Sequence, residues 1–159
     1  FVGFSAHTTK SALDAMSQYA FDTVMFPINF IEYYQFGFGQ EVLAEAQKQG
    51  AGVLAIKPMC GGLWGEKEER TRQWWYKPLE ERREINMALR FTLSLPGVTA
   101  GVAPGMLDLF PKALEVVKIY QPSTEEEKRE LEGMAKERIS VFQADQKNYA
   151  YGDPSHYYA

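Results

Sequence analysis

Four short apolar runs recur along the chain, and each ends in polar or turn-forming residues. They lie at residues 1–7, 22–29, 52–58 and 98–105. Each run is too short for an ordinary helix, and most of them lack strict alternation of apolar and polar positions. Strands that are buried on both faces of a parallel sheet have this pattern. Because a helix-like segment follows each run, the sequence predicts an α/β fold with four βα units.

The segments between the runs carry the usual signals for helix starts and stops. We expect Thr8 or Thr9 to cap the first helix and Gly50 to end the second. Residues 31–39 are rich in glycine and aromatic side chains, and we expect them to form a loop. The first expected helix begins near Lys10, and the second spans Gln40–Gln49. The third runs from Pro78 to Leu95, the fourth spans Leu107–Tyr120, and the fifth runs from Glu125 to about Phe142.

The chain has 159 residues, which suits one domain but falls short of the roughly 250 residues of an eight-unit barrel. Four parallel strands fit either half of a closed barrel or a small doubly wound sheet of the flavodoxin type. The flavodoxin type is less favoured, because no phosphate-binding loop follows the first run. We expect one domain over residues 1–142 and an irregular, tyrosine-rich tail over residues 143–159. Because Phe1 already lies in a strand-like run, we expect the sequence to be part of a longer one.

Charge and cysteine content narrow the possible function classes. The net charge of −4 argues against a nucleic-acid partner. Cys60 is the single cysteine, so neither an intrachain disulfide nor a multi-cysteine metal site can form, and we expect its thiol to be unreactive. No apolar run approaches the roughly 20 residues of a membrane span. We therefore expect a cytoplasmic protein without a metal or a membrane contact.

Polar side chains stand where the first three runs end, and parallel sheets place their ligands at this edge. Ser5 offers a hydroxyl that both donates and accepts hydrogen bonds. Asn29 either meets a ligand or ties down the loop that follows it. Lys57 must direct its amine toward water, an acid or a bound phosphate. His7 has no partner at a recognisable catalytic spacing, so a loop position beside the next helix explains it better.

Two further features follow the last two runs. Gly61, Gly62 and Gly105 would let backbone amides approach a pyrophosphate, although simple turns explain these glycines as well. Residues 63–78 form a long excursion that contains the aromatic cluster Trp74-Trp75-Tyr76. Connections of this length are often functional lids, and we favour a lid over a substrate above a packing or association surface.

The order of these pieces resembles that of a known family. The matching stretches are Val2-Gly3-Phe4-Ser5, residues 24–29, residues 52–59 with Gly61-Gly62, residues 88–94 and residues 98–106. Together they resemble strands five to eight, the C-terminal half, of the aldo/keto reductase barrel. The stretch over residues 98–106, with its Pro-Gly turn, is the most specific match. The resemblance covers residues 1–142.

The resemblance implies the (β/α)4 half of a TIM-type (β/α)8 barrel with parallel strands and an additional C-terminal helix. Enzymes of this family bind NADPH or NADH without a metal and reduce the carbonyl groups of small substrates. Their catalytic residues lie on the first four strands, so by resemblance this chain carries none of them. Ser5 stands where the family's serine binds the nicotinamide carboxamide. In the whole enzyme we expect Ser5, Asn29, Lys57, Gly61, Gly62 and Gly105 to hold the cofactor.

Three positions depart from the family pattern. Met25 stands where the family usually offers a glutamine to the nicotinamide amide, and Ile56 stands where a tyrosine often stacks on the ring. Asp108 lies in the stretch where an arginine often holds the adenosine phosphate. Because a carboxylate would repel a 2′-phosphate, the choice between NADP and NAD stays open.

Two functions from different classes are consistent with these observations. The first is the cofactor-side half of an NAD(P)H-dependent aldo/keto reductase, which acts on a small carbonyl substrate once an N-terminal half barrel supplies the catalytic residues. The second is a catalytically inactive half-barrel module that pairs with a second copy of itself. The physical reason for such pairing is that four strands leave two open sheet edges, which a dimer would close.

Overall fold

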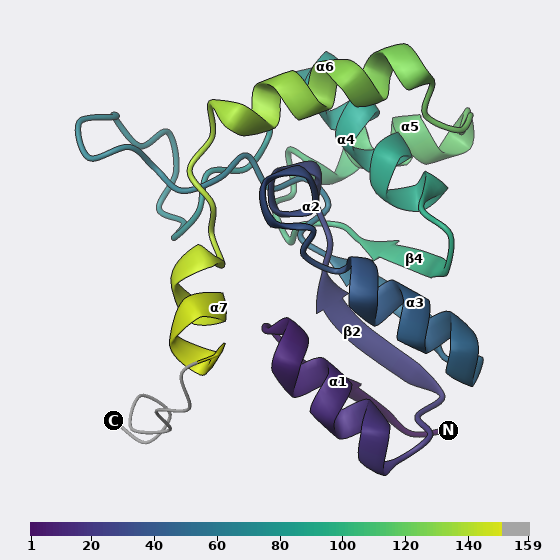
Figure 1. The fold of residues 1–159 in the computed structure, drawn as a ribbon. Coiled ribbons are helices and arrows are strands. Elements are labelled where there is room, and N and C mark those ends of the chain that lie inside the picture. The colour runs from purple at the N-terminus through teal and green to yellow at the C-terminus, as the bar shows by residue number, and fades with distance from the viewer. Residues whose placement is uncertain (151–159) are drawn as a thin grey trace.

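The computed structural model describes residues 1–150, and the expectations for the last part of the tail, including His156, lie outside this part. Within it the chain forms one parallel sheet of four strands with seven helices (Figure 1). The strands are β1 (Gly3–Ser5), β2 (Thr23–Pro27), β3 (Gly52–Ile56) and β4 (Val98–Val102). The helices are α1 (Thr9–Gln18), α2 (Phe30–Phe36), α3 (Gln40–Gln49), α4 (Arg82–Ser94), α5 (Phe110–Lys118), α6 (Glu125–Lys136) and α7 (Gln143–Ala150).

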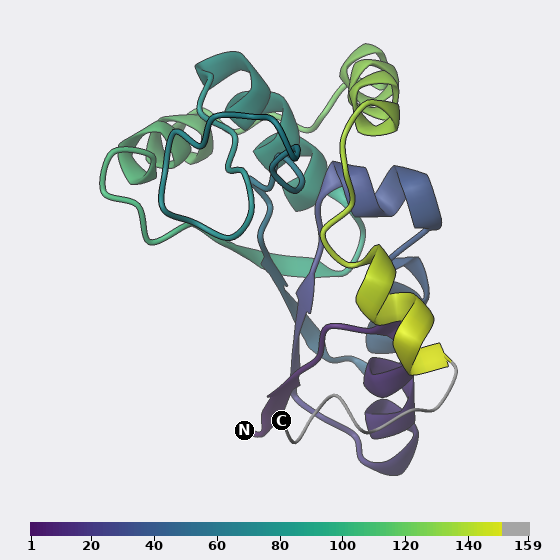
Figure 2. The ribbon, with the colours of Figure 1, turned by 90° about the vertical axis from the view of Figure 1, so that its left-hand side faces the viewer.

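The strands lie in chain order, β1-β2-β3-β4, and each pairs in parallel with the next. A doubly wound sheet of the flavodoxin type reverses its strand order at a switch point, so that alternative is wrong. Consecutive parallel strands are the arrangement of a (β/α)8 barrel. Figure 2 shows α1 and α3 on one face of the sheet, whereas no described helix covers the opposite face of β1 to β3. The predicted half barrel is therefore confirmed.

The strand register sorts side chains onto these two faces. Phe4, Val24 and Val53 lie side by side on three neighbouring strands, and both valines are fully buried. Because side chains alternate along a strand, the next residues in register, Met25 and Leu54, point to the opposite face, and both are partly exposed there. This second face is the one that would line the interior of a closed barrel.

Two hydrophobic cores hold the helices in place. The first lies between the sheet and the helices α1 and α3, and its fully buried members include Ala12, Val24, Phe26, Val42 and Val53. The second joins α2, α4, α5 and α6, and its fully buried members include Phe30, Ile31, Ile85, Leu109 and Leu131. The carboxyl ends of β2 and β3 lie where these cores meet, so the residues that follow these strands stand on a rigid support.

Several elements form where local sequence signals predicted them. The helix α3 has the predicted bounds Gln40–Gln49, and Gly50 ends it in the left-handed conformation, with a φ of 73°. The first helix begins at Thr9, because the Thr8 side chain accepts a hydrogen bond from the amide of Ser11 and caps it. These boundaries depend on contacts between residues that are close in sequence.

The segment predicted as a loop over residues 31–39 is instead largely the helix α2. Asn29 caps this helix, and Gly37 ends it in the left-handed conformation. Its side chains pack on neighbouring helices, with the ring of Tyr33 centred 5.3 Å from that of Phe91 on α4. The glycines that suggested a loop therefore mark the end of a short helix whose stability comes from tertiary packing.

The C-terminal part of the chain also differs from the elements that its sequence predicted. The last predicted helix begins at Glu125 as expected but ends at Lys136, as α6, and Thr124 and Glu127 form a full capping box at its start. A linker follows, and the helix α7 occupies part of the segment that was expected to be irregular. Figure 1 places α7 away from α6 and beside the start of α1. The linker thus crosses the molecule.

None of the described helices is long and apolar enough to cross a membrane.

Candidate functional site

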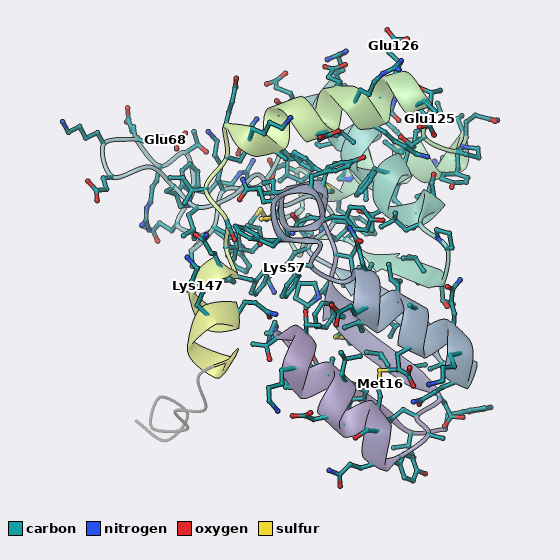
Figure 3. The ribbon with its side chains drawn as sticks, viewed as in Figure 1. Met16, Lys57, Glu68, Glu125, Glu126 and Lys147 are labelled. Carbon is teal, nitrogen blue, oxygen red and sulfur yellow. The ribbon has the colours of Figure 1, made fainter. Side chains whose placement is uncertain are left out.

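Lys57 directly follows β3 and is the centre of the candidate site. Its φ of 58° puts it in the left-handed region, and it is the only described residue other than glycine with a positive φ. A side chain raises the cost of this conformation, so such residues often mark functional positions. Lys57 is partly buried and lies in the middle of the molecule, between α2 and α7 in the view of Figure 3.

Two aromatic rings face the Lys57 ammonium. Its Nζ lies 5.6 Å from the ring centroid of Trp75 and 5.3 Å from that of Phe142. Both distances are within the range of cation–π attraction. Within the described residues, no ion pair joins Lys57 to a carboxylate. Burial lowers the pKa of Lys57, because the charged form is poorly solvated there.

A cavity of about 220 Å³ lies beside Lys57, between the ends of β3 and β4 and the excursion. Among the described residues that line it, Lys57 is the single charged one. The other lining residues are apolar or aromatic, and they are Ile56, Pro58, Met59, Trp74, Trp75, Tyr76, Val102, Ala103 and Pro104. An apolar cavity with one polar anchor is the usual form of a small-molecule site.

The aromatic excursion lies over this cavity, as a lid would. Trp74 and Trp75 keep 42% and 51% of their surface exposed, whereas Tyr76 is buried. The Trp75 and Tyr76 rings meet edge to face, with their centroids 5.0 Å apart. Tyr76 therefore anchors the cluster, and the two tryptophans present their rings to solvent and to the cavity.

His7 stands just before α1, as the sequence suggested, and touches the site through Phe142. Their ring centroids lie 5.8 Å apart, and the planes are nearly parallel. Partial cover of the ring and the positive charge of Lys57 both lower the pKa of His7, while Asp145 opposes them. Phe142 thus lies next to both Lys57 and His7, and these contacts could not be predicted because the residues are far apart along the chain.

Ser5 and Gly105 are open to a ligand. Ser5 ends β1 and pairs in register with Met25, so its side chain shares the uncovered face of the sheet. It is exposed, and so is Gly105 beyond β4. A Cβ added to Gly105 would meet no atom within 4 Å. Both residues are free to contact a group placed at the carboxyl ends of the strands.

Asn29 mainly serves the fold. Its Oδ1 accepts hydrogen bonds from the amides of Ile31, at 3.0 Å, and Glu32, at 3.1 Å. The residue is fully buried, and its Nδ2 has no hydrogen-bond partner among the described residues. The cap explains the asparagine, and the unpaired Nδ2 is the part of it that a ligand would satisfy.

Gly61 and Gly62 are explained by packing. The Gly61 amide donates to the carbonyl of Lys77 at 2.7 Å, and the Gly62 amide lies 3.4 Å from the Cys60 sulfur. A Cβ on Gly62 would lie 2.7 Å from the carbonyl oxygen of Ile139. Neither amide is free to hold a pyrophosphate, so the structure does not bring these two glycines into the site. Burial raises the pKa of Cys60 to about 12, in keeping with an unreactive thiol.

Solved structures of known proteins resemble this chain. The holo form of the aldo-keto reductase AKR11C1 from Bacillus halodurans matches with a TM-score of 0.58 and 16% identity, over 87% of this chain and 51% of that one. Its apo form gives a TM-score of 0.56 and 15% identity, over 86% and 51%. The thermostable aldo-keto reductase Tm1743, in complex with the inhibitor epalrestat, gives 0.52 and 18% identity, over 84% and 48%. This chain has the fold of half an aldo-keto reductase barrel.

The half barrel spans about half the length of the solved structures that it matches. No protein-family model and no curated protein sequence matches it. At these identities the likeness concerns the fold, and any activity has to be argued from the side chains of the half barrel itself.

An arginine that sequence reasoning missed stands beside Asp108 of the half barrel. Arg72, from the excursion, donates to both carboxylate oxygens of Asp108, at 2.9 Å and 2.5 Å, and also pairs with Glu80. These contacts keep the pKa of Asp108 below its usual range. The three side chains together carry one net negative charge, so Arg72 reduces the repulsion expected from Asp108 without reversing it.

A buried acid of the half barrel was also missed. Glu32, on α2, accepts hydrogen bonds from the Ser140 hydroxyl and the Val141 amide. These bonds fix the linker that carries Phe142 over the strand ends. No sequence signal marks the pairing, since the partners lie more than a hundred residues apart.

The described residues contain no group of three His, Cys, Asp or Glu side chains placed to hold a metal ion.

Proposed function

We propose that this chain is the cofactor-side half of an NAD(P)H-dependent aldo-keto reductase that reduces carbonyl groups of small molecules. The observation that carries the proposal is the set of four in-order parallel strands, which matches half of each aldo-keto reductase structure. The second support is the position of Ser5 and Lys57 at the carboxyl ends of β1 and β3, the edge where barrels of this type place their chemistry.

Three groups fit a nicotinamide nucleotide at this edge. The Ser5 hydroxyl suits a carboxamide, because it both donates and accepts. The Lys57 ammonium, which has no carboxylate partner among the described residues, suits a phosphate. The exposed Gly105 leaves room for a ligand to approach its backbone. Such a nucleotide supplies the hydride of the reduction, and these residues would bind and orient it.

Two other groups are poorly suited to the same ligand. Met25, on the uncovered face, cannot donate a hydrogen bond to a carboxamide. The triad of Arg72, Glu80 and Asp108 keeps a net negative charge near the end of β4. We therefore propose that NADH suits the site better than NADPH.

The proposal requires a second half barrel, which supplies the proton donor and closes the sheet. Within the described residues β1 pairs only with β2, and β4 pairs only with β3, so both edges are open. Apolar side chains lie exposed near both edges, with Phe1 and Val2 at β1 and Leu107 and Phe110 beyond β4. Open edges and exposed apolar side chains are features that a partner would cover.

A second copy of this chain is the other candidate partner. Figure 2 shows the two edge strands at opposite ends of one curved sheet. Two copies related by a two-fold axis would pair β4 of each with β1 of the other and complete eight parallel strands. In that case the chain is a self-associating half-barrel module, and it lacks the proton donor of the missing half.

Nucleotide binding tests the first function. Trp74 and Trp75 line the cavity, so their fluorescence should change when NADH or NADPH is titrated into the chain, alone or mixed with an N-terminal half barrel. We expect K57A to weaken binding about tenfold and S5A to weaken it about fivefold. S17A is the matched control, because the Ser17 hydroxyl lies on α1 and donates to the Asp14 carbonyl. Equal affinity in all three variants would contradict the proposed binding residues.

Carbonyl reduction tests the full proposal. The closed barrel, formed with an N-terminal half, should consume NADH when a small aldehyde is added. The chain alone should consume none. Failure of every closed barrel to oxidise NADH or NADPH with any aldehyde would leave the self-associating module as the better account.

Substitution at an exposed helix face tests the second function. Leu114 lies on α5, the helix that follows the edge strand β4 in the chain, and keeps 39% of its surface exposed. If two copies close one barrel, L114K should convert a dimer to a monomer in sedimentation, whereas E132K on the distant helix α6 should not. A dimer that survives L114K would show that this edge is not the contact.

A further inference from the structure

We propose that Lys57 is a reactive amine that forms a reversible imine with small, flat aldehydes in the cavity between the ends of β3 and β4. This activity goes beyond the proposed nucleotide-dependent reduction, because the carbon–nitrogen bond forms without a cofactor. Two observations support the proposal: the surroundings of the Lys57 amine and the residues that line the cavity.

The surroundings leave the amine available. No carboxylate among the described residues forms an ion pair with Lys57, so no fixed negative charge holds its proton. The rings of Trp75 and Phe142 face its Nζ instead, and Phe142 is only 2% exposed. The rings attract the ammonium, but partial burial of the side chain outweighs this attraction and lowers the pKa of Lys57, which favours the neutral, nucleophilic amine.

The backbone fixes where this amine stands. Lys57 is held at a φ of 58°, between the last residue of β3 and Pro58, whose own φ is fixed by its ring. Pro58 and Met59 are buried, so this stretch cannot shift without disturbing the core. A lysine held in a rigid, unusual conformation at the end of a barrel strand is placed for chemistry rather than for solubility.

The cavity defines the class of aldehyde. Its volume of about 220 Å³ is below the roughly 300–1,000 Å³ of drug-sized sites, so the ligand is small. Its walls carry the aromatic rings of Trp74 and Trp75 and apolar side chains such as Val102. A planar, apolar aldehyde such as benzaldehyde matches these walls, because its ring can stack on indole.

The reaction balances without any other reagent. The neutral Lys57 amine attacks the carbonyl carbon, a carbon–nitrogen bond forms, and the oxygen becomes a hydroxyl group. Loss of that hydroxyl as water gives the imine, and addition of water reverses the step. The pKa of Lys57 is lowered by burial, so more free amine is present at neutral pH than on an exposed lysine. The thiol of Cys60 stays neutral, because burial raises its pKa to about 12.

Reductive trapping tests the proposal on the full chain. Benzaldehyde at a concentration equal to that of the protein is mixed with sodium cyanoborohydride, which converts an imine to a stable secondary amine. Intact mass then counts the labels, and peptide mapping locates them. We expect Lys57 to be labelled before any other lysine, and much slower labelling of Lys48, whose side chain is 76% exposed.

Two variants test whether the label depends on the amine of Lys57. K57R keeps the positive charge between the two rings but has no free amine near neutral pH, and we expect it to lose the label completely. K48R should keep the label on Lys57 unchanged. Circular dichroism checks that both variants fold, and if K57R does not, the peptide map of the unchanged chain still decides. Labelling of Lys57 no faster than that of Lys48 would overturn the proposal.

Discussion

The Ser140 hydroxyl donates a hydrogen bond of 2.6 Å to the carboxylate of Glu32, although 108 residues separate them in the sequence. The amide of Val141 donates to the other carboxylate oxygen at 2.7 Å. Glu32 is 1% exposed, so these bonds are shielded from water. They hold the linker between α6 and α7 against α2 and thereby place Phe142 beside Lys57.

Removal of this carboxylate should destabilise the fold. E32A leaves the Ser140 hydroxyl and the Val141 amide without their acceptor, and a buried donor that loses its partner costs about 1–3 kcal/mol. We expect the free energy of unfolding in urea to fall by about 2 kcal/mol or more. E132A is the control, because Glu132 is exposed on α6, and it should change stability by less than about 0.5 kcal/mol. Equal effects of the two substitutions would contradict the role of Glu32.

The same carboxyl group should make stability depend on pH. Burial raises the pKa of Glu32 above its ordinary value of 4.5, and the bonds from Ser140 and Val141 offset this only in part. A raised folded-state pKa gives a contribution that is full below the unfolded pKa and is lost as pH rises through the folded pKa. E32Q cannot titrate there. The unfolding free energy of the unchanged chain minus that of E32Q should therefore be larger near about pH 4 than near about pH 7, and a constant difference would refute the shift.

Cys60 should resist alkylation while the chain is folded. Its side chain is fully buried, and burial raises its pKa to about 12, so almost no thiolate is present at neutral pH. Iodoacetamide should label it only after denaturant unfolds the protein. The measurement is the rate of mass gain with and without denaturant. Rapid labelling in native buffer would show that the core around β3 opens readily.

Two glycines form a matched pair for substitution. Gly62 has a φ of 99°, and a Cβ there would lie 2.7 Å from the Ile139 carbonyl oxygen. We expect G62A to lower the unfolding free energy by about 1–3 kcal/mol, because the strained conformation and the contact both oppose it. Gly105 has no atom within 4 Å of an added Cβ, so G105A should change stability by less than about 0.5 kcal/mol. Thermal unfolding of both variants compares them directly.

Asp108 should influence nucleotide preference if the proposed cofactor site is correct. D108A removes one negative charge and leaves Arg72 paired with Glu80 alone. We expect affinity for NADPH, relative to NADH, to rise about fivefold, which corresponds to about 1 kcal/mol. E115A is the control, because Glu115 is an exposed acid that pairs with Arg82. The same change with both nucleotides would place Asp108 away from the 2′-phosphate.

Local sequence signals were enough for the strands, for their number and for the best-bounded helix. Gly50 ends α3 where predicted, because a left-handed glycine cap depends only on neighbouring residues. The helix α2 was not predictable, since its short aromatic sequence becomes helical through contacts such as that between Tyr33 and Phe91. The linker after α6 was missed for the same reason, because Glu32 fixes it from far away in the sequence.

In the candidate site, too, some features follow from the local sequence and others only from the folded structure. Lys57 was expected to direct its amine toward water, an acid or a bound phosphate at the end of its strand, and its position there follows from the strand pattern alone. Its neighbour Phe142 comes from the far end of the described chain, and only the folded structure brings the two together. Gly61 and Gly62 look like a phosphate loop in sequence, but the Lys77 backbone and the Ile139 carbonyl explain them.

We propose above all that this chain is half of a barrel that holds a nicotinamide nucleotide and is closed by a partner. The most direct test is the solution mass by light scattering, measured with the unfolding temperature, with and without excess NADH or NADPH. The account predicts a closed assembly, such as a dimer, whose unfolding temperature rises when nucleotide is added, because a ligand that binds only the folded state stabilises it. A chain that stays a monomer and ignores both nucleotides, both alone and when mixed with an N-terminal half barrel, would contradict it.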